Sequence, residues 1–571
     1  MTRRRCKTAP TALVRCAGFL LLGGCNFAPH YDAPHTKPSA AFKEAVPGGD
    51  SAAQGWKLAD PRDASIRNNW WEAYHDPRLN DLEVRVAISN QTIVAAEANY
   101  RAAHALVLEA QAQLFPTLSL VPSVTREKSS AALAGVNGAA ASGSTTGGAT
   151  TATASTTTAP AGGSSTTHNV FEFPLEASYQ IDLWGSIRNT VAESRYAAQA
   201  SAAQLANALL STQSTLAQDY FQLRVADEQR RILETTVADY QASLHLVRTL
   251  VASGVDSEAD IATAESQLES AMAAATDAGV ARAQYEHAIA VLVGVSPAQF
   301  SIPYQHFNQQ LPIIPVGVPS DLLERRPDIA AAERQVAESN AQIGVARAAY
   351  FPSLTLSASA GYESTALSQL FNAPNRFWSV GPSLAQVLFD GGARRAAVLQ
   401  ARALNESQVA TYRQTVLSAF QSVEDNLASL RILSVELGQA HKATVAAKRA
   451  VELTVVLYRN GVDSYVSVIT AQNAFLSARE TELQVQLRQL IASVTLVNDL
   501  GGDWATSQMA QSERMAMHPP ASAEAQSPAA NSGTAVPNPP PMPAGEIRPD
   551  DLIKQNEDAM APEPGDSGLQ R

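Results

Sequence analysis

The chain has 571 residues, of which 45% are hydrophobic and 17% are charged. This composition is too apolar for a disordered chain, and the length indicates several domains unless an internal repeat accounts for it. The formal net charge is −12, although the first 25 residues hold five basic residues and no acidic one. Phosphate binding needs a concentrated basic face, so this charge argues against a nucleic-acid partner.

Residues 1–24 are predicted to be a lipoprotein signal peptide. Basic residues precede a short apolar stretch, and the order Leu, Gly, Gly, Cys then ends at Cys25. This order matches a lipobox, whose cysteine becomes the acylated N-terminal residue; the alternative is an ordinary signal peptide with an incidental cysteine. Asn26 favours sorting to the outer membrane. We therefore expect a covalent lipid on Cys25 as the anchor of the chain, and no other cofactor.

The body of the chain has no cysteine, because the only two others, Cys6 and Cys16, lie within the signal peptide. Thiol nucleophiles, disulfides and cysteine-ligated metals are thereby excluded from the body. No apolar run approaches the roughly 18 residues of a transmembrane helix. If the protein crosses a membrane, we expect it to do so with strands.

The sequence contains an internal repeat. Residues 95–120 match 331–356 without a gap, and the turn sequence at 254–257 recurs at 461–464. A unit that is used twice buries its apolar face by packing on its own copy. The expected parts are a signal peptide (1–24), an N-terminal lipidated segment (25–77), repeat 1 (78–294), a linker (295–320), repeat 2 (321–504) and a Pro- and Ala-rich disordered tail (505–571).

Each repeat contains long segments with coiled-coil spacing. Mostly apolar or small residues recur in alternating steps of three and four along 79–114 and 205–251, which predicts coiled-coil helices at about 78–114 and 185–253. Small residues dominate these seams, so the helices can approach closely around a hollow. At 1.5 Å per residue, the helix 185–253 is about 100 Å long, and those at 78–114 and 258–294 are each about 55 Å long. Repeat 2 is expected to contain corresponding helices at 391–460 and 465–500.

Between the helices lie four segments of about ten residues in which apolar and polar residues alternate. They are expected at 117–125, 170–182, 353–362 and 377–388. A tilted strand of about this length can cross a bilayer, although the same alternation occurs in half-buried soluble sheets. Three acidic residues lie on the polar side of the second segment: Glu172, Glu176 and Asp182. In a channel they would form lumenal rings that favour cations, or would simply keep the lumen hydrated.

Residues 126–169 consist almost wholly of Ser, Thr, Ala and Gly. This composition cannot form a packed core. We therefore expect a flexible loop between the first two strands, with a much shorter equivalent at 363–376 in repeat 2.

No motif for catalysis or metal binding occurs in the sequence. A metalloprotease His pair, a phosphate-binding glycine loop, a Gly-x-Ser-x-Gly elbow and a Cys-x-x-Cys pair are all missing, and the ten histidines are scattered singly. We therefore expect neither an enzyme nor a metal site. A periplasmic coiled-coil adaptor is a third hypothesis, but it does not explain four strands of membrane-spanning length.

Several short motifs occur together between about residues 25 and 504. They are Gly24-Cys25, Trp70-Trp71, Asp76-Pro77-Arg78-Leu79, the Phe-Pro turns at 115–116 and 351–352, Glu324-Arg325-Arg326-Pro327-Asp328-Ile329, Phe389-Asp390-Gly391-Gly392 and Tyr458-Arg459-Asn460-Gly461-Val462. In combination they resemble the TolC-like outer-membrane efflux family, and within it the lipoprotein branch of NodT type that is partnered with resistance-nodulation-division pumps.

The resemblance implies a mainly α-helical protein with a membrane β part. Each chain would supply four transmembrane strands to a shared twelve-stranded barrel in the outer membrane, above a long coiled-coil α-helical barrel in the periplasm. A homotrimer of this kind is a passive conduit that docks to a periplasmic adaptor (membrane fusion) protein and an inner-membrane pump. The implied function is export of drugs or other small molecules; the alternative is the outer-membrane channel of a type I protein or peptide secretion system.

The number of strands independently sets a lower limit on the number of chains. Four strands cannot close a barrel, and open strand edges are not tolerated in lipid. Two chains would give eight strands, whose interior is filled by side chains, so a conduit needs at least three chains. The resemblance then selects three.

The two glycine turns are a second place where we expect function. The resemblance implies that they form the periplasmic tips and that Gly254, Val255, Gly461 and Val462 contact the adaptor, although turn geometry alone explains the glycines. No pump or substrate can be identified from the chain itself.

Family members often carry aspartates that ring the constriction on the short helix after the second turn, but the corresponding positions here are Ser467 and Thr470. We therefore predict that Asp463, with Arg459 and the acids of the first turn, closes the tip through charges and hydrogen bonds, while Ser467 and Thr470 line the narrowest bore. The first-turn acids are Asp256, Glu258 and Asp260. If all of these are only solvated turn residues, each ion pair contributes about 0–1 kcal/mol.

Overall fold

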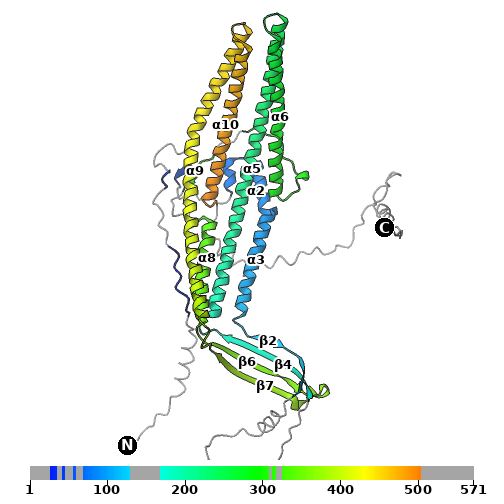
Figure 1. Ribbon diagram of the computed structural model, residues 1–571, viewed down its shortest axis with the longest axis vertical. Coiled ribbons are helices and arrows are strands. Elements are labelled where there is room, and N and C mark those ends of the chain that lie inside the picture. Colours follow the sequence, from blue (N-terminus) through cyan, green and yellow to red (C-terminus); the bar gives the residue numbers. More distant parts are fainter. Residues whose placement is uncertain are drawn as a thin grey trace, which may run out of the picture. The chain divides into compact units, whose positions relative to one another are not determined.

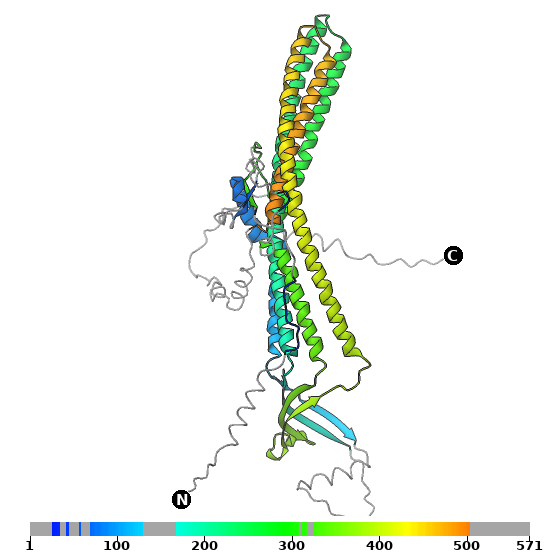
Figure 2. The same ribbon diagram turned by 90° about the vertical axis from the view of Figure 1, so that its left-hand side faces the viewer.

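Two very long helices of equal length form the frame of the protein. In the computed structural model, α5 (Ser186–Ala252) and α9 (Ala393–Arg459) each have 67 residues, which corresponds to about 100 Å. Helices α6 (Glu258–Leu292) and α10 (Tyr465–Asp499) have 35 residues each, and α3 (Gln91–Ala112) and α8 (Pro327–Ala348) have 22 each. Figures 1 and 2 show α3 and α6 following one another along α5, and α8 and α10 doing so along α9.

The structure describes residues 26–34, 42–44, 56–58, 69–128, 167–307, 311–316 and 325–502, all of which lie in one unit, Met1–Met517. The predicted signal peptide, Cys25, most of the predicted loop 126–169 and the predicted tail 505–571 lie outside the described residues. Among the described residues, no helix is both long enough and apolar enough to span a membrane.

One antiparallel sheet lies at the end of the helices opposite the tip turns (Figure 1). Its strands are β2 (Thr117–Leu120), β3 (Ser123–Lys128), β4 (Thr167–Ile181), β6 (Ser353–Ser364) and β7 (Arg376–Ala385). The order is β2-β4-β6-β7, and β3 also pairs with β4. Thr117 lies opposite Ser178 and Ser123 opposite Glu172, so β2 and β3 follow one register and behave as one interrupted strand.

The two faces of this sheet differ in polarity. Directly opposed residues share a face, and one face carries Leu175 opposite Ala360, which in turn lies opposite Trp378. The other face carries Glu176 opposite Ser359. Large apolar side chains on the first face are exposed in the single chain, and Trp378 is 77% exposed. The sheet therefore has the apolar and polar faces that the alternation predicted.

The prediction of a single helix at 78–114 is wrong, because two helices occupy this range. Helix α2 (Pro77–Ser89) ends at Asn90, and α3 begins after it. The Asn90 side-chain oxygen accepts hydrogen bonds from the amides of Thr92 and Ile93 at 2.8 and 3.2 Å, and its amide nitrogen donates to the Leu292 carbonyl at 2.7 Å. Asn90 thus caps α3 and ties it to the end of α6.

The apolar core lies where α2 and the short helix η3 (Trp70–Tyr74) pack on the middle of α5. Tyr74 contacts Phe221 with ring centroids 5.0 Å apart, and the Tyr220 hydroxyl donates to the Asp76 carboxylate at 2.7 Å. Asp76 also caps α2 by accepting from the amide of Arg78 at 2.9 Å. The motif around Trp70-Trp71 and Asp76-Pro77 therefore anchors the N-terminal helices to α5.

A buried ion network joins α5 to α6 beside this core. Asp227 accepts from Arg224 at 3.0 Å and from Arg282 at 2.8 Å, and Arg282 also pairs with Glu286 at 3.0 Å. Arg224 further donates to the Pro303 carbonyl at 2.9 Å. Because removing one member of a buried pair leaves an uncompensated charge, this network fixes the relative position of α5, α6 and the segment after α6.

The Arg-Arg-Pro-Asp motif fastens the start of α8 to the end of α10. Arg326 pairs with Asp328 at 2.7 Å and with Asp499 at 3.2 Å, and Asp499 also accepts from Asn426 of α9 at 2.8 Å. The backbone of Gly501 then passes directly over the Arg325 carbonyl.

A second, very small sheet lies within ranges that the sequence indicated only as a lipidated segment and a linker. Strands β1 (Trp56–Leu58) and β5 (Ile314–Val316) pair in parallel. Each has three residues, which is too short for a period-two pattern to be visible in the sequence.

Gly501 and Gly461 offer a matched comparison, since both have positive φ, of 87° and 71°, after the ends of helices. A Cβ at Gly461 would meet nothing within 4 Å, whereas one at Gly501 would lie 2.1 Å from the Arg325 carbonyl oxygen. We predict that Gly461→Ala costs only the left-handed backbone penalty, about 1–2 kcal/mol. Gly501→Ala is expected to cost more, because the Arg325 backbone must also move. Thermal unfolding followed by circular dichroism measures the decrease in melting temperature for each variant. Equal decreases in the two variants would contradict the prediction.

Candidate functional site

The two tip turns have the same backbone geometry. After α5, the amide of Val255 donates to the Leu250 carbonyl at 3.0 Å, and after α9 the amide of Val462 donates to the Leu457 carbonyl at 3.0 Å. Gly254 has a φ of 73°. This is the Schellman arrangement, in which a left-handed glycine closes a helix.

Each tip turn exposes one large apolar side chain. Val255 is 63% exposed and Val462 is 71% exposed in the single chain. The turns therefore expose apolar side chains at two of the residues for which the family resemblance implies an adaptor contact.

The acids of the first turn are held by local hydrogen bonds. The Asp256 carboxylate accepts from the amide of Ser257 at 3.1 Å, and Asp260 accepts from the Ser257 hydroxyl at 2.6 Å. The hydrogen bond from Ser257 lowers the pKa of the Asp260 carboxyl. Glu258 and Asp260 lie in the first turn of α6, where acids are favoured by the helix dipole.

Asp463 is held in the second turn by the serine that follows it on α10. Its carboxylate accepts from the Ser467 hydroxyl at 2.7 Å and from the Ser464 amide at 2.8 Å. Thr470 donates its hydroxyl to the Val466 carbonyl of the same helix at 2.8 Å. Arg459 lines a cavity between the helical hairpins, and the described residues of the single chain include no ion pair between Arg459 and Asp463.

One hydrogen bond that the sequence did not indicate joins the two turns. The Tyr458 hydroxyl donates to the Asp256 carboxylate, across residues that lie 202 positions apart in the chain. Burial and this bond raise the pKa of Tyr458 well above its usual range. The Tyr458 ring packs on that of Tyr465 with centroids 5.5 Å apart, and burial raises the pKa of Tyr465 to about 12. The two hairpins of one chain are thus latched together at their tips.

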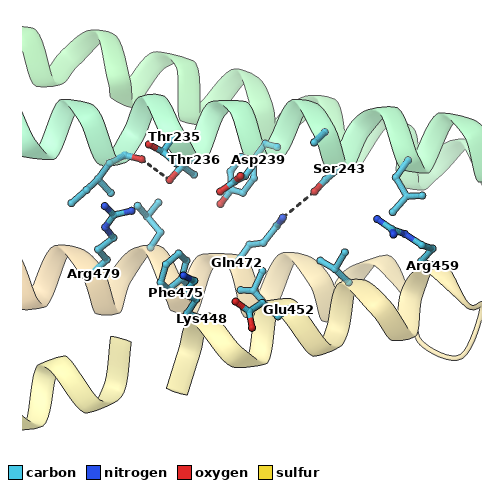
Figure 3. A pocket seen from close by; sticks show the side chains of 17 residues that line it. Thr235, Thr236, Asp239, Ser243, Lys448, Glu452, Arg459, Gln472, Phe475 and Arg479 are labelled. Carbon is cyan, nitrogen blue, oxygen red and sulfur yellow. Dashed lines mark hydrogen bonds between the residues drawn. The ribbon is translucent and has the colours of Figure 1, made fainter. Parts of the chain in front are cut away.

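Further from the tips, polar side chains join α5 to α10. The Tyr240 hydroxyl donates to the Asn473 side-chain oxygen at 3.0 Å, and Gln267 of α6 donates to the same oxygen at 2.6 Å. Gln472 donates to the Ser243 hydroxyl at 2.9 Å, as Figure 3 shows. These bonds hold the two hairpins of one chain side by side.

These bonds border a cavity of about 460 Å³ between α5 and the α9–α10 hairpin (Figure 3). Its wall carries both signs of charge: Asp239, Lys448, Glu452, Arg459 and Arg479. Burial raises the pKa of Asp239, and the nearby Arg479 opposes this shift. With mixed charge and an apolar wall, the cavity does not select one sign of charge.

Two of the three predicted lumenal acids lie on the polar face of the sheet. Glu172 of β4 lies opposite Glu363 of β6 and accepts a hydrogen bond from the Ser123 hydroxyl at 3.0 Å; Glu176 lies on the same face. Asp182 follows the end of β4 and accepts from the backbone amide and the guanidinium of Arg188 at 2.9 and 3.1 Å. Its charge is therefore paired at the start of α5.

The segment that follows Cys25 is attached to α8. The carbonyls of Phe27 and Pro29 accept from Arg347 at 3.2 Å and from Asn340 at 3.0 Å. The Phe27 ring stacks on Phe351 with centroids 4.3 Å apart, beside the first residues of β6. Phe27, two residues after the predicted lipidation site, is thus fixed at the junction of helices and sheet.

Within the described ranges, no group of three or more His, Cys, Asp or Glu residues is placed to hold a metal ion. The polar groups described above lie in the tip turns, in the hydrogen bonds between the two hairpins and on one face of the sheet. These features suit a channel and its contacts.

Long paired helices that end in acidic turns, joined to a sheet with one apolar face, define a membrane-channel protein with a helical extension. The chain belongs to the outer membrane efflux protein family, which it matches over residues 84–295 and 318–502. The whole helical frame and the sheet lie within or between these two ranges.

Individual relatives match nearly their full length. The chain is 30% identical over 492 residues to the pyoverdine export outer membrane protein OpmQ of Pseudomonas aeruginosa, covering 86% of this chain and 96% of OpmQ. It is 27% identical over 505 residues to the antibiotic efflux pump outer membrane protein ArpC of Pseudomonas putida, covering 88% of this chain and 96% of ArpC.

Solved structures show the same fold. The outer-membrane channel OprN is 27% identical with a TM-score of 0.72, covering 84% of this chain and 100% of OprN. The CmeC outer membrane channel of Campylobacter jejuni has a TM-score of 0.74 at 23% identity, covering 86% of this chain and 98% of CmeC.

The hydrogen bond between Tyr458 and Asp256, here called the tip latch, yields a prediction that has a matched control variant. Tyr458→Phe keeps the ring but removes the hydrogen bond to the Asp256 carboxylate, and a hydrogen bond to a charged group contributes about 1.5–3 kcal/mol. We predict that amides of the first turn, 253–257, exchange with deuterium about tenfold faster or more in this variant. Tyr465→Phe removes a hydroxyl for which the structure gives no hydrogen bond, so it should leave exchange unchanged. Equal exchange in the two variants would contradict the latch.

Proposed function

We propose that the chain is the outer-membrane channel of a tripartite efflux system, a passive trimeric conduit that carries drugs or other small molecules to the exterior. The single observation that carries the proposal is a sheet with an apolar face, exposed in the single chain, at the opposite end of about 100 Å helices from the acidic tip turns. A protein with these parts can hold one end in lipid and extend the other far into the periplasm. Membership of the outer membrane efflux protein family supports the same function.

The proposed assembly is a homotrimer whose chains share a twelve-stranded barrel. Within one chain, β2 with β3 and β7 each pair on only one side among the described strands, and strand edges in lipid must be paired. The proposed partners are a periplasmic adaptor and an inner-membrane pump of the resistance-nodulation-division type. The names of the relatives ArpC and OpmQ, for antibiotic efflux and pyoverdine export, support small-molecule efflux over type I protein secretion.

We place the adaptor contact and the gate at the tip turns. Gly254 and Gly461 shape the turns, and Val255 and Val462 supply the exposed apolar surface for the adaptor. In the gate, Asp463 acts with the Ser467 hydroxyl that holds it. Arg459 reaches across to a neighbouring chain, and the first-turn acids and Thr470 complete the polar ring. If the latch is part of this gate, Tyr458→Phe also raises single-channel conductance.

We further propose that a lipid on Cys25 anchors the chain at the outer membrane. The stacking of Phe27 on Phe351 supports this location, because Phe351 lies two residues before β6. A lipid at position 25 would then lie at the level where the strands leave the helices, which is where the proposed barrel meets the periplasmic side of the bilayer.

The conduit is tested with purified protein and with cells. We predict heat-modifiable trimers in detergent that conduct ions in planar bilayers, and cells lacking the protein that become sensitive to the small molecules its pump exports. Returning the gene should restore resistance, while secreted protein in the medium stays constant. Detergent-solubilised monomers without conductance, or loss of a secreted protein without a change in drug resistance, would overturn the proposal.

The lipid anchor is tested by labelling. We predict that cells fed labelled palmitate incorporate it into the wild-type chain but not into Cys25→Ser, because the thiol of Cys25 is the acceptor. Cys16→Ser is the matched control and should be labelled normally, since this cysteine lies within the predicted signal peptide. Continued labelling of Cys25→Ser would contradict the assignment.

A further inference from the structure

The charged residues of the five-stranded sheet are sorted by sign between its two faces. Every acid of the described strands lies on the polar face, the face of Glu176, and every Arg or Lys lies on the apolar face, the face of Leu175. Neighbouring strand residues point to opposite faces, so even adjacent charges are separated in this way. The acids are Glu127, Glu172, Glu176 and Glu363, and the bases are Arg126, Lys128 and Arg376.

The three bases lie toward the end of the sheet that is away from the helices (Figure 1). Arg126 lies opposite Asn169, near the start of β4, and Lys128 follows two residues later on the same face. Arg376 is the first residue of β7 and lies opposite Tyr362. All three bases are exposed in the single chain. Within the described strands, no acid shares their face to neutralise them.

The apolar side chains of this face span the height of a membrane. On β4 they run from Ile181 to Phe171, ten steps along the strand, at about 3.3 Å per step. In a strand tilted by about 40° this corresponds to about 25 Å, the height of the apolar band on membrane barrels. Asn169 and Arg126 form the next pair on the same face. Arg126 therefore lies just beyond the band, where lipid head groups begin.

Aromatic side chains mark the same boundary. Phe371, in the connection between β6 and β7, packs on Phe173 with ring centroids 5.7 Å apart and on Tyr362 with centroids 5.4 Å apart. Phe173 and Tyr362 lie opposite one another on the apolar face, and Trp378 follows Arg376 on it. Membrane barrels carry girdles of aromatic residues where hydrocarbon meets head groups. The connection is thus folded onto the apolar face at the level of Arg376.

The sign of the charges on this face indicates what lies against it. Hydration of the rim would be served equally well by acids and bases, so hydration alone does not explain the sorting. A phosphate in a lipid head group repels an acid and attracts a base. A guanidinium can also donate two parallel hydrogen bonds to phosphate oxygens. Bases beside an apolar, aromatic surface therefore match a ligand that has both phosphates and acyl chains.

We propose that Arg126, Lys128 and Arg376 bind the phosphates of a phosphorylated glycolipid in the outer leaflet of the outer membrane. Lipid A has this chemistry, because its sugars carry phosphates at one end and acyl chains at the other. The guanidinium and ammonium groups contact the phosphates, and the acyl chains lie along the apolar face against Phe173 and Trp378.

The inference rests on the proposed position of the sheet in the outer membrane, and it adds a lipid partner to that proposal. The acids of the polar face, which the proposed conduit turns toward its lumen, repel the same phosphates. The sorting of charge therefore holds the lipid at the outside of the barrel and disfavours its entry into the conduit.

Native mass spectrometry of the full-length protein in mild detergent measures the binding, with lipid A that carries two phosphates as the probe. We predict that the triple variant Arg126→Gln, Lys128→Gln and Arg376→Gln binds this lipid about tenfold more weakly than the wild-type chain, or weaker still. The reason is that each base near an anionic lipid surface adds to the attraction. The variant should sediment as the wild-type chain does, because the bases contact lipid.

The matched control removes three charges from the polar face, with Glu127→Gln, Glu172→Gln and Glu176→Gln. Glu127 lies between Arg126 and Lys128 in the chain, so the control alters the same strand on its other face. This variant should bind lipid A as tightly as the wild-type chain. A second comparison needs no variant: removal of both phosphates from lipid A should weaken its binding to the wild-type chain to the level of the triple base variant. Inorganic phosphate should not displace lipid A, because it has no acyl chains.

The outcomes separate the lipid site from the proposed function. Equal binding of phosphorylated and dephosphorylated lipid A to the wild-type chain overturns the site, even if no variant folds. Equal loss of binding in the two triple variants overturns it as well, and so does displacement of lipid A by inorganic phosphate. Loss of the trimer in the base variant alone would show that the bases join chains instead. In each of these cases, wild-type protein that conducts ions in planar bilayers leaves the conduit standing, whereas protein that neither inserts nor binds lipid overturns both.

Discussion

The hydrogen-bonding edges of the sheet are the constraint on which the rest of this structure depends. Each chain supplies too few strands to close a barrel, and its outer strands pair on one side only within the described residues. In lipid an unpaired edge is not tolerated, and the proposed assembly meets this constraint by sharing one barrel among copies of the chain. The long helices then inherit the arrangement of the strands, because α5 and α9 each begin a few residues after a strand ends.

Contacts at the helix ends connect the strands to the tip turns. Left-handed glycines close α5, α6, α9 and α10, and the contacts that matter most join one helix end to another. Asn90 binds the end of α6, and Arg326 binds the end of α10. With the buried Asp227 network, these contacts fix the middle of the molecule. From there the helices pack on each other through larger apolar side chains, which include Leu244, Val247 and Val468 toward the tips and Val336 and Val416 toward the strands.

The periodic parts of this fold were accessible from the sequence, and the non-periodic contacts were not. Strands and long helices follow from alternation and heptad spacing, whose residues are numerous and regular. The break at Asn90 was missed because the heptad phase continues across it, so only the side-chain hydrogen bonds of Asn90 reveal it. At the tips, sequence reasoning located the acidic turns. It could not find the bond between Tyr458 and Asp256, since these residues become neighbours only when the two repeats pack.

The hydrogen bond between Tyr458 and Asp256 makes the contacts at the tips of the proposed assembly unequal. The contacts within one chain include this bond, and those between chains do not. By repeat position, the counterpart of Tyr458 is Val251 and that of Asp256 is Asp463. In the proposed trimer, Val251 and Asp463 of neighbouring chains would therefore take the places that Tyr458 and Asp256 have within one chain, and a valine side chain has no hydroxyl to donate to the carboxylate. A force that spreads the tips would therefore separate neighbouring chains before it separates the two hairpins of one chain.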